Sequence, residues 1–292
     1  MNFIQSILLG LIQGLTEFLP VSSSGHLAIF KNIFRVNVET GLLFDVLLHL
    51  GTLLAICAVY WDDIKELFVE GIHMLCGWCY NTIVFISNLF CKNKRKYRHV
   101  ITTAYRRFVL MIIVSSVPTA IIGILLEDII ESASDVLIIP GICLIVTGLM
   151  LSVLDHMPSG KKNELSASYK DATFIGIIQG IATLPGISRS GSTIFACRKS
   201  GFNKEFAVKY SFIMSIPAVL GSALLQLKDS SVLAVSMSEL LCYIVGMTVA
   251  AVVGYICIKT MLLIVKNNKF RYFSCYCIAL GMITSICYFL IK

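Results

Sequence analysis

Two polar stretches interrupt long apolar regions of the chain and hold the residue types that could perform catalysis. The first contains Gln13, Glu17, Ser23 and His26, grouped around Pro20. Gln13 and Glu17 are four residues apart, so on a helix they share one face. Ionisable groups inside an apolar segment are costly and mark functional sites by default. We interpret this stretch as one wall of a site; the alternative is a polar patch that holds the segment against its neighbours.

The second stretch places Arg189 inside an apolar hairpin, where an unpaired charge would cost at least ~2.5 kcal/mol. Its guanidinium is a planar fork of donors that matches a phosphate or a carboxylate. Hydroxyl side chains flank it, namely Ser188, Ser190 and Thr193. We expect a helix to begin near Ser192, with its free N–H groups directed at the same anion. This pattern predicts an oxyanion cradle, most simply for phosphate; alternatively Arg189 pairs with Glu17 or Asp45, and such a pair opens when substrate arrives.

Asp45 and His49 form a third polar pair, four residues apart on one face of an expected helix. An aspartate and a histidine that face the same way suit a site wall, a proton relay or a metal position. A hydrogen-bonded pair between two helices is an equally simple interpretation. These alternatives stay open at the level of the sequence.

The composition shows what kind of protein must position these residues. Of 292 residues, 57% are hydrophobic and only 14% are charged, whereas a soluble globular domain carries about 25% charge. The low charge excludes a disordered, collagenous or ordinary cytosolic protein and predicts a polytopic membrane protein. The net charge of +7 then reflects basic cytoplasmic loops and not a nucleic-acid partner.

Six segments have the ~20 apolar residues that a membrane-spanning helix needs. They are residues 42–60, 109–126, 136–154, 206–227, 240–258 and 272–291. Two further apolar segments, 1–30 and 172–197, are broken in the middle by Pro, Gly and Ser, which predicts re-entrant hairpins. Segment 72–91 is interrupted by Trp78 and two asparagines, and whether it spans is left open. The predicted fold is an all-α polytopic membrane protein with six transmembrane helices and two re-entrant helical hairpins.

An internal repeat supports this prediction. Residues 12–25 (IQGLTEFLPVSSSG) align with residues 178–191 (IQGIATLPGISRSG) at an offset of 178 minus 12, or 166. We therefore expect a single integral membrane domain built from two copies of one unit, residues 1–154 and residues 172–292. Inverted repeats with broken helices place the working site near the middle of the membrane, where the copies meet.

The basic loops predict the orientation of the copies. Residues 92–107 contain seven Lys or Arg and no acidic residue, so they should be cytoplasmic. Further Lys/Arg-bearing loops should lie on the same side, namely 155–171, 198–209 and 259–271. Segment 172–197 then enters from the cytoplasm, segment 1–30 enters from outside if 72–91 does not span, and the two copies are inverted.

The two broken segments resemble the signature of the undecaprenyl-diphosphate phosphatase family of the bacitracin-resistance type. Its first motif is Glu or Gln, three residues and then Glu, running into a Leu-Pro-Val-Ser-Ser-x-Gly-His stretch, and residues 13–26 match it throughout, with Phe18 between Glu17 and the stretch. Its second motif, Pro-Gly-x-Ser-Arg-Ser-x-x-Thr, is matched in full by residues 185–193. The resemblance spans essentially the whole chain, and 61–107 is its divergent part.

The resemblance implies a hydrolase that converts undecaprenyl diphosphate to undecaprenyl phosphate and inorganic phosphate. This recycles the lipid carrier for cell-wall (peptidoglycan) synthesis and confers bacitracin resistance. The resemblance also implies a multi-pass protein of the bacterial inner membrane, with its site facing the outer, periplasmic side. The partners expected are the polyprenyl diphosphate substrate and membrane lipids, with no nucleic acid, and a homodimer is also considered.

The family's motif residues transfer position by position. The catalytic residues implied are Glu17, Ser23, His26 and Arg189. The substrate-binding residues implied are Gln13, Ser22, Ser188, Ser190 and Thr193. Many members carry two glutamates in the first motif, whereas this chain has Gln13, which cannot ionise. A divalent cation, Mg²⁺ or Ca²⁺, would therefore bind Glu17, with Asp45 and substrate phosphate oxygens completing its shell.

The expected mechanism uses the Arg189 cradle to bind the diphosphate, and His26, whose ordinary pKa is near neutrality, as general acid–base. The nucleophile is Ser23 activated by His26, or a water activated by His26 or the metal. A different class of function, a transporter or flippase of a polyprenyl phosphate or other anionic substrate, is the alternative. Inverted repeats with broken helices are also a transporter architecture.

Overall fold

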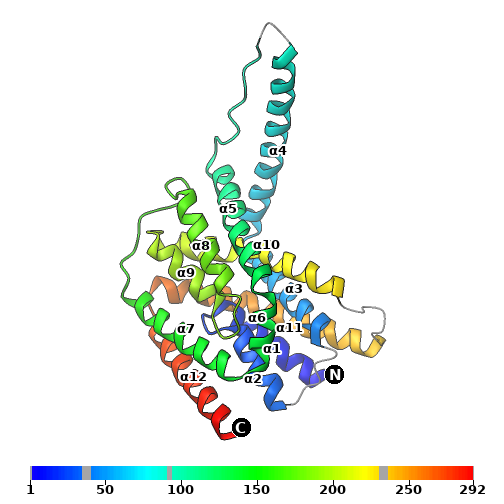
Figure 1. Cartoon of the computed structure of the whole chain (residues 1–292), viewed down its shortest axis with the longest axis vertical. Helices are drawn as coiled ribbons and strands as arrows, with labels where there is room; N and C mark the ends of the chain where they lie inside the picture. Colours follow the sequence, from blue (N-terminus) through cyan, green and yellow to red (C-terminus); the bar gives the residue numbers. More distant parts are fainter. Residues whose placement is uncertain (1, 35–40, 91–93, 230–235, 292) are drawn as a thin grey trace.

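The computed structural model describes residues 2–34, 41–90, 94–229 and 236–291, which form the twelve α-helices of Figure 1. The first seven are α1 (Phe3–Phe18), α2 (Ser23–Phe34), α3 (Gly41–Val59), α4 (Trp61–Phe90), α5 (Ala104–Leu125), α6 (Glu127–Asp135) and α7 (Ile138–His156). The remaining five are α8 (Tyr169–Ile181), α9 (Arg189–Lys199), α10 (Lys204–Asp229), α11 (Met237–Lys266) and α12 (Arg271–Ile291). The prediction of an all-helical fold is confirmed.

Five of the described helices, α5, α7, α10, α11 and α12, are long and apolar enough to cross a membrane. Residues Leu43–Val59 of α3 qualify as a candidate span together with α4, to which they are joined at a bend of 89°. The count of spanning helices is therefore five, or six if the bent pair is one span. The arrangement of six spans with two re-entrant hairpins, and the orientation of the loops, stay predictions. The multi-pass character of the protein is supported directly by these helices.

Both broken segments are helix–turn–helix units. Helix α1 ends before Pro20 because the residue that precedes a proline avoids helical backbone angles, and Leu19 is extended. Helix α9 is capped by Ser188, whose hydroxyl accepts a hydrogen bond from the Gly191 N–H at 3.1 Å. This cap starts α9 at Arg189, earlier than the start near Ser192 that we expected, so Arg189 is the first residue of the helix.

Each hairpin packs on the opposite half of the chain: α1 lies along α11, and α8 lies along α5. The helices approach at glycines that the 166-residue offset superimposes. A Cβ atom at Gly10 would lie 2.4 Å from the Gly246 carbonyl oxygen, and one at Gly176 would lie 2.1 Å from the Ser115 carbonyl oxygen. Close approach at small residues is typical of helix packing in membranes. The two sequence repeats thus make equivalent contacts, while their inversion stays a prediction.

Helix α4 bears on the open question of segment 72–91. Residues 72–90 of that segment lie within one continuous 30-residue helix whose C-terminal part projects away from the other helices (Figure 1), and residue 91 lies outside the described residues. Its asparagines do not interrupt the helix. The Asn81 amide bonds the backbone N–H and C=O of Arg98 at 2.8 and 2.9 Å, and the Asn88 amide bonds those of Arg95 at 2.7 and 2.9 Å.

The spacing of these two asparagines along α4 explains why they bind two residues that are three positions apart in the segment after the helix. Seven helical residues rise ~10.5 Å, and three extended residues span about 10 Å. Asn81 and Asn88 therefore meet backbone groups three residues apart in the neighbouring chain. They hold the basic segment that follows α4 along the helix.

Candidate functional site

The turns of the two hairpins meet each other. The Gly186 N–H lies 3.4 Å from the Ser24 hydroxyl, and the Ser190 hydroxyl lies 3.5 Å from the Leu19 carbonyl oxygen. Ser24 and Ser190 are themselves related by the repeat offset, although Ser24 accepts its hydrogen bond and Ser190 donates its own. Helices α2 and α9 both begin at this point. Their N-terminal N–H groups carry partial positive charge, which favours an anion between the hairpins.

Glu17 is the centre of the polar cluster at this crossing. Its carboxylate is buried, and Oε1 forms an ion pair with the Arg189 guanidinium. The other oxygen, Oε2, accepts a hydrogen bond from the Ser23 hydroxyl at 2.6 Å and one from Gln13 Nε2 at 3.0 Å. Arg189 thus pairs with Glu17, one of the two partners that the sequence suggested. The side chain of Arg189 is 22% exposed against 4% for Glu17, so the guanidinium is the side of the pair that an entering anion meets.

His49 joins the same cluster from α3. Its Nδ1 lies 3.0 Å from Gln13 Nε2 and 3.8 Å from Glu17 Oε2. Because an amide nitrogen only donates, Nδ1 is the acceptor and the ring proton of a neutral His49 sits on Nε2. Asp45 lies one turn earlier on α3 and is half-buried. His49 of α3 contacts both Gln13 and Glu17.

His26 is engaged elsewhere. Its Nδ1 lies 2.7 Å from the Ser22 carbonyl oxygen, and its Nε2 lies 2.7 Å from the hydroxyl of Tyr276 on α12. The structure therefore places Glu17, and not His26 as we expected, against the Ser23 hydroxyl. The physical reason is helical phase: α2 begins at Ser23, so His26, three residues later, turns toward the Ser22 carbonyl and α12.

The remaining hydroxyls of the expected cradle are bound within the protein. Ser188 caps α9, and Ser22 accepts the Gly25 N–H at 3.2 Å at the start of α2. Thr193 is bonded to the Arg189 carbonyl oxygen at 2.8 Å and to the Ser211 hydroxyl. These side chains shape the two helix starts, while Arg189, Ser23 and the helix N-termini are left to face a ligand.

Two residues that no sequence motif contains hold the turns. Thr147 of α7 donates to the Gly186 carbonyl oxygen at 3.0 Å and accepts the Ser188 N–H at 3.0 Å. Cys277 of α12 donates to the Pro20 carbonyl oxygen at 3.7 Å. Each turn is thus braced by the last spanning helix of the other half. Both residues lie in apolar runs, where nothing in the sequence separates them from ordinary packing residues.

The side chains at the crossing of the two hairpins could supply only part of the ligand shell of a metal ion. Among the described residues, no group of three or more His, Cys, Asp or Glu side chains is placed to hold a metal. Glu17 already pairs with Arg189, but the buried Oε1 of Gln13 has no hydrogen-bond partner among the described residues. A divalent cation would fit here only with ligand oxygens supplied by a substrate, in the way that Mg²⁺ commonly binds.

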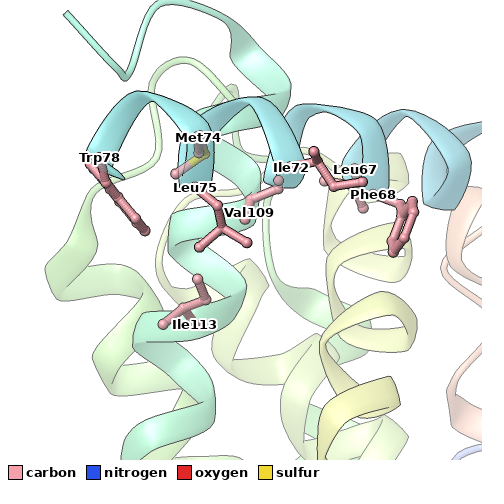
Figure 2. A pocket seen from close by; sticks show the side chains of 9 residues that line it. Leu67, Phe68, Ile72, Met74, Leu75, Trp78, Val109 and Ile113 are labelled. Atoms are coloured by element: carbon pink, nitrogen blue, oxygen red, sulfur yellow. The ribbon is translucent and has the colours of Figure 1, made fainter. Parts of the chain in front are cut away.

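A separate groove of about 270 Å³ lies between α4 and α5 (Figure 2). Phe68, Leu75 and Trp78 of α4 face Val109 and Ile113 of α5 across it. The residues that line it are apolar side chains and one glycine, so none can transfer a proton or bind a phosphate by charge. The chemistry therefore belongs to the hairpin crossing and not to this groove.

Comparison with known proteins identifies the family of this chain. A model of the family described as bacitracin resistance protein BacA matches residues 6–283. A protein named undecaprenyl-diphosphatase from Methanosphaera stadtmanae is 39% identical over 286 residues, covering 98% of each chain. Proteins of the same name from Alkaliphilus metalliredigens and Treponema denticola are 38% and 37% identical, covering 97% and 98% of this chain and 98% and 97% of their own.

Proposed function

This chain belongs to the bacitracin resistance protein BacA family, and we propose that it is an integral membrane phosphatase that hydrolyses undecaprenyl diphosphate to undecaprenyl phosphate and inorganic phosphate. The observation that carries the proposal is the cluster of Glu17, Ser23 and Arg189 at the crossing of the two hairpins. Phosphoryl transfer needs positioning and neutralisation of charge more than elaborate covalent chemistry. A hydroxyl, a carboxylate, a guanidinium and two helix N-termini supply both.

In the first step the diphosphate enters between the helix N-termini and Arg189 turns from Glu17 to the phosphate oxygens. Glu17 thereby loses its counter-charge and becomes a stronger base toward the Ser23 hydroxyl, 2.6 Å away. The Ser23 oxygen forms a bond to the terminal phosphorus as its proton passes to Glu17. The bond from that phosphorus to the bridging oxygen breaks, and undecaprenyl phosphate leaves with the electron pair.

In the second step a water hydrolyses the phosphate on Ser23. The water attacks the phosphorus and gives up a proton to His26, and the bond to the Ser23 oxygen breaks as that oxygen takes back the proton that Glu17 received in the first step. Inorganic phosphate leaves and the hydroxyl of Ser23 is restored. Arg189 stabilises the charge on the phosphate oxygens in both steps.

We further propose that a divalent cation, Mg²⁺ or Ca²⁺, assists the binding of substrate. Glu17 and the Gln13 amide oxygen would hold it, with Asp45 nearby, and substrate phosphate oxygens would complete its shell. Its contribution would be to neutralise the charge of the diphosphate. Gln13 would act on substrate through this cation, whereas Ser22, Ser188, Ser190 and Thr193 act on it through the shape of the two turns.

The surroundings of the reaction follow from the same proposal. The product is the lipid carrier for cell-wall precursors, so its recycling would support peptidoglycan synthesis and bacitracin resistance. The protein would lie in the bacterial inner membrane with its site toward the periplasm, in contact with membrane lipids and without a nucleic-acid partner. Residues 1–154 and 172–292 would be inverted copies, and a homodimer is compatible with this arrangement.

Release of phosphate from undecaprenyl diphosphate by the purified protein in detergent tests the proposal. We expect release by the unaltered protein and less than about one hundredth of that rate for Arg189→Ala. A transporter or flippase of a polyprenyl phosphate would move lipid across vesicle membranes without releasing phosphate. No release with or without Mg²⁺, together with lipid movement, would therefore replace the phosphatase by that alternative.

A further inference from the structure

We propose that Tyr276 of α12 is a positioning residue for the reaction, which holds the His26 ring with Nε2 as an unprotonated acceptor. The proposal rests on the phosphatase function and names a residue outside both motifs of the hairpins. Its basis is the chain of contacts that runs from the Tyr276 hydroxyl through the His26 ring to the Ser22 carbonyl oxygen.

The direction of these hydrogen bonds follows from the Ser22 carbonyl. A carbonyl oxygen only accepts, so His26 Nδ1, 2.7 Å from it, must carry the ring proton. A neutral imidazole then has its lone pair on Nε2. The Tyr276 hydroxyl, 2.7 Å from Nε2, is therefore the donor. The two contacts together select one tautomer of the ring.

Two further contacts keep the ring in place. The rings of His26 and Tyr276 stack, with centroids 5.6 Å apart and an angle of 12° between their planes. The next residue of α12, Cys277, bonds the Pro20 carbonyl oxygen at the other end of the turn. Ser22 between them has a φ of 70°, in the left-handed region, which a non-glycine residue occupies only where its surroundings impose it. Helix α12 is thus the element that fixes this turn.

This tautomer is the one that the second step requires. A histidine that accepts a proton from water needs a free lone pair on the nitrogen that faces the water. The Tyr276 hydroxyl occupies that nitrogen in the resting site, and Tyr276 is itself 46% exposed. In the second step a water takes the place of the hydroxyl at Nε2, while the Ser22 carbonyl oxygen keeps the ring proton on Nδ1.

Tyr276→Phe removes the hydroxyl and keeps the ring, and Tyr272→Phe is the matched control, because Tyr272 lies one turn earlier on α12 and is 74% exposed. Nitrogen NMR of the full-length protein with labelled histidine, in detergent and without substrate, reports the tautomer directly. The His26 signals are identified by their loss in His26→Ala. We expect a proton on Nδ1 and a hydrogen-bonded Nε2 in the unaltered protein and in Tyr272→Phe, and a shift of the Nε2 signal in Tyr276→Phe.

We expect Tyr276→Phe to affect kcat and KM differently. Tyr276→Phe should lower kcat about tenfold through loss of orientation and leave KM unchanged, whereas Tyr272→Phe should change neither. If Tyr276 acts through His26, Tyr276→Phe has no further effect on kcat in the His26→Ala background, as a double-mutant cycle shows.

An unchanged Nε2 signal or an unchanged kcat in Tyr276→Phe would overturn the proposal, as would a loss of the same size in the His26→Ala background. Failure of the phosphatase function has a different signature. The unaltered protein would then release no phosphate, while the NMR measurement would still decide whether Tyr276 holds the His26 ring.

Discussion

Glu17 and Arg189 lie 172 residues apart in the chain, yet their carboxylate and guanidinium form an ion pair where the turns of the two hairpins meet. One partner comes from each sequence repeat. The pair therefore exists only when both halves are assembled, and through Glu17 it links Ser23, the proposed nucleophile of one hairpin, to Arg189, the proposed anion-binding group of the other.

The ion pair makes separate predictions for stability and for catalysis. Glu17→Gln leaves Arg189 without its partner and should lower the free energy of unfolding by up to about 3 kcal/mol. Exchanging the residues, Glu17→Arg with Arg189→Glu, should restore much of the thermal stability and none of the phosphate release. Arg189→Lys keeps the charge but loses the planar fork, so a rate close to that of the unaltered protein would argue against the cradle. Thermal unfolding in detergent and phosphate release measure the two effects.

Gln13→Glu tests the proposed cation. The new carboxylate would lie near Glu17 Oε2, which is 3.0 Å from Gln13 Nε2 at present, and two carboxylates at that distance repel unless a cation or a proton lies between them. We expect half-maximal activity at a lower Mg²⁺ concentration in Gln13→Glu, measured after removal of metal with a chelator. Equal activity of the two proteins after chelation, with no response to added Mg²⁺ or Ca²⁺, would remove the cation from the account.

The packing of the hairpins predicts a difference between two glycines. Gly176→Ala would place a Cβ 2.1 Å from the Ser115 carbonyl oxygen and should destabilise the protein by about 1–3 kcal/mol, as overpacking does. Gly123 of α5, the helix on which α8 packs, has open space at its Cβ position and is the control. Gly123→Ala should leave the melting temperature unchanged or raise it slightly. Equal melting temperatures for the two variants would contradict the close contact of α8 and α5.

The start of the second hairpin predicts a dependence of stability on pH. Burial raises the pKa of Asp171, but hydrogen bonds from Lys162 and Ser168 outweigh it and hold the pKa below the ordinary value. A carboxyl whose pKa is lower in the folded protein contributes stability above its unfolded pKa, and the contribution is lost as the pH falls through the folded pKa. Asp171→Asn should therefore lower the melting temperature at neutral pH. The difference from the unaltered protein should shrink as the pH is lowered below about 4; a difference that stays constant with pH would contradict this assignment.

Much of the site could be predicted from the sequence because it lies where the helical pattern breaks. Pro20, Pro185 and the neighbouring serines mark the turns, and the 166-residue offset relates Gly10 to Gly176 before any contact is known. A buried charge needs a partner, and Glu17 is one of the two partners for Arg189 that the sequence suggests. These features are local in the sequence or repeated within it.

The rest depends on which helix faces which, and that is a property of packing. Thr147 and Tyr276 lie in apolar helices far along the chain from the turns that they hold, so no spacing connects them to the site. Thr193 follows the second motif as expected, but the phase of α9 turns its hydroxyl to Ser211. His26 faces α12 for the same reason, and the Ser23 hydroxyl donates its hydrogen bond to Glu17.

The most direct test of the account is the fate of Ser23 during turnover of undecaprenyl diphosphate. We expect rapid quenching to trap a phosphate on Ser23, detected by mass spectrometry, and Ser23→Ala to abolish phosphate release. Ser22→Ala, a change in the neighbouring hydroxyl, should retain phosphate on Ser23. Full turnover by Ser23→Ala, or a trapped phosphate on another residue, would contradict the mechanism.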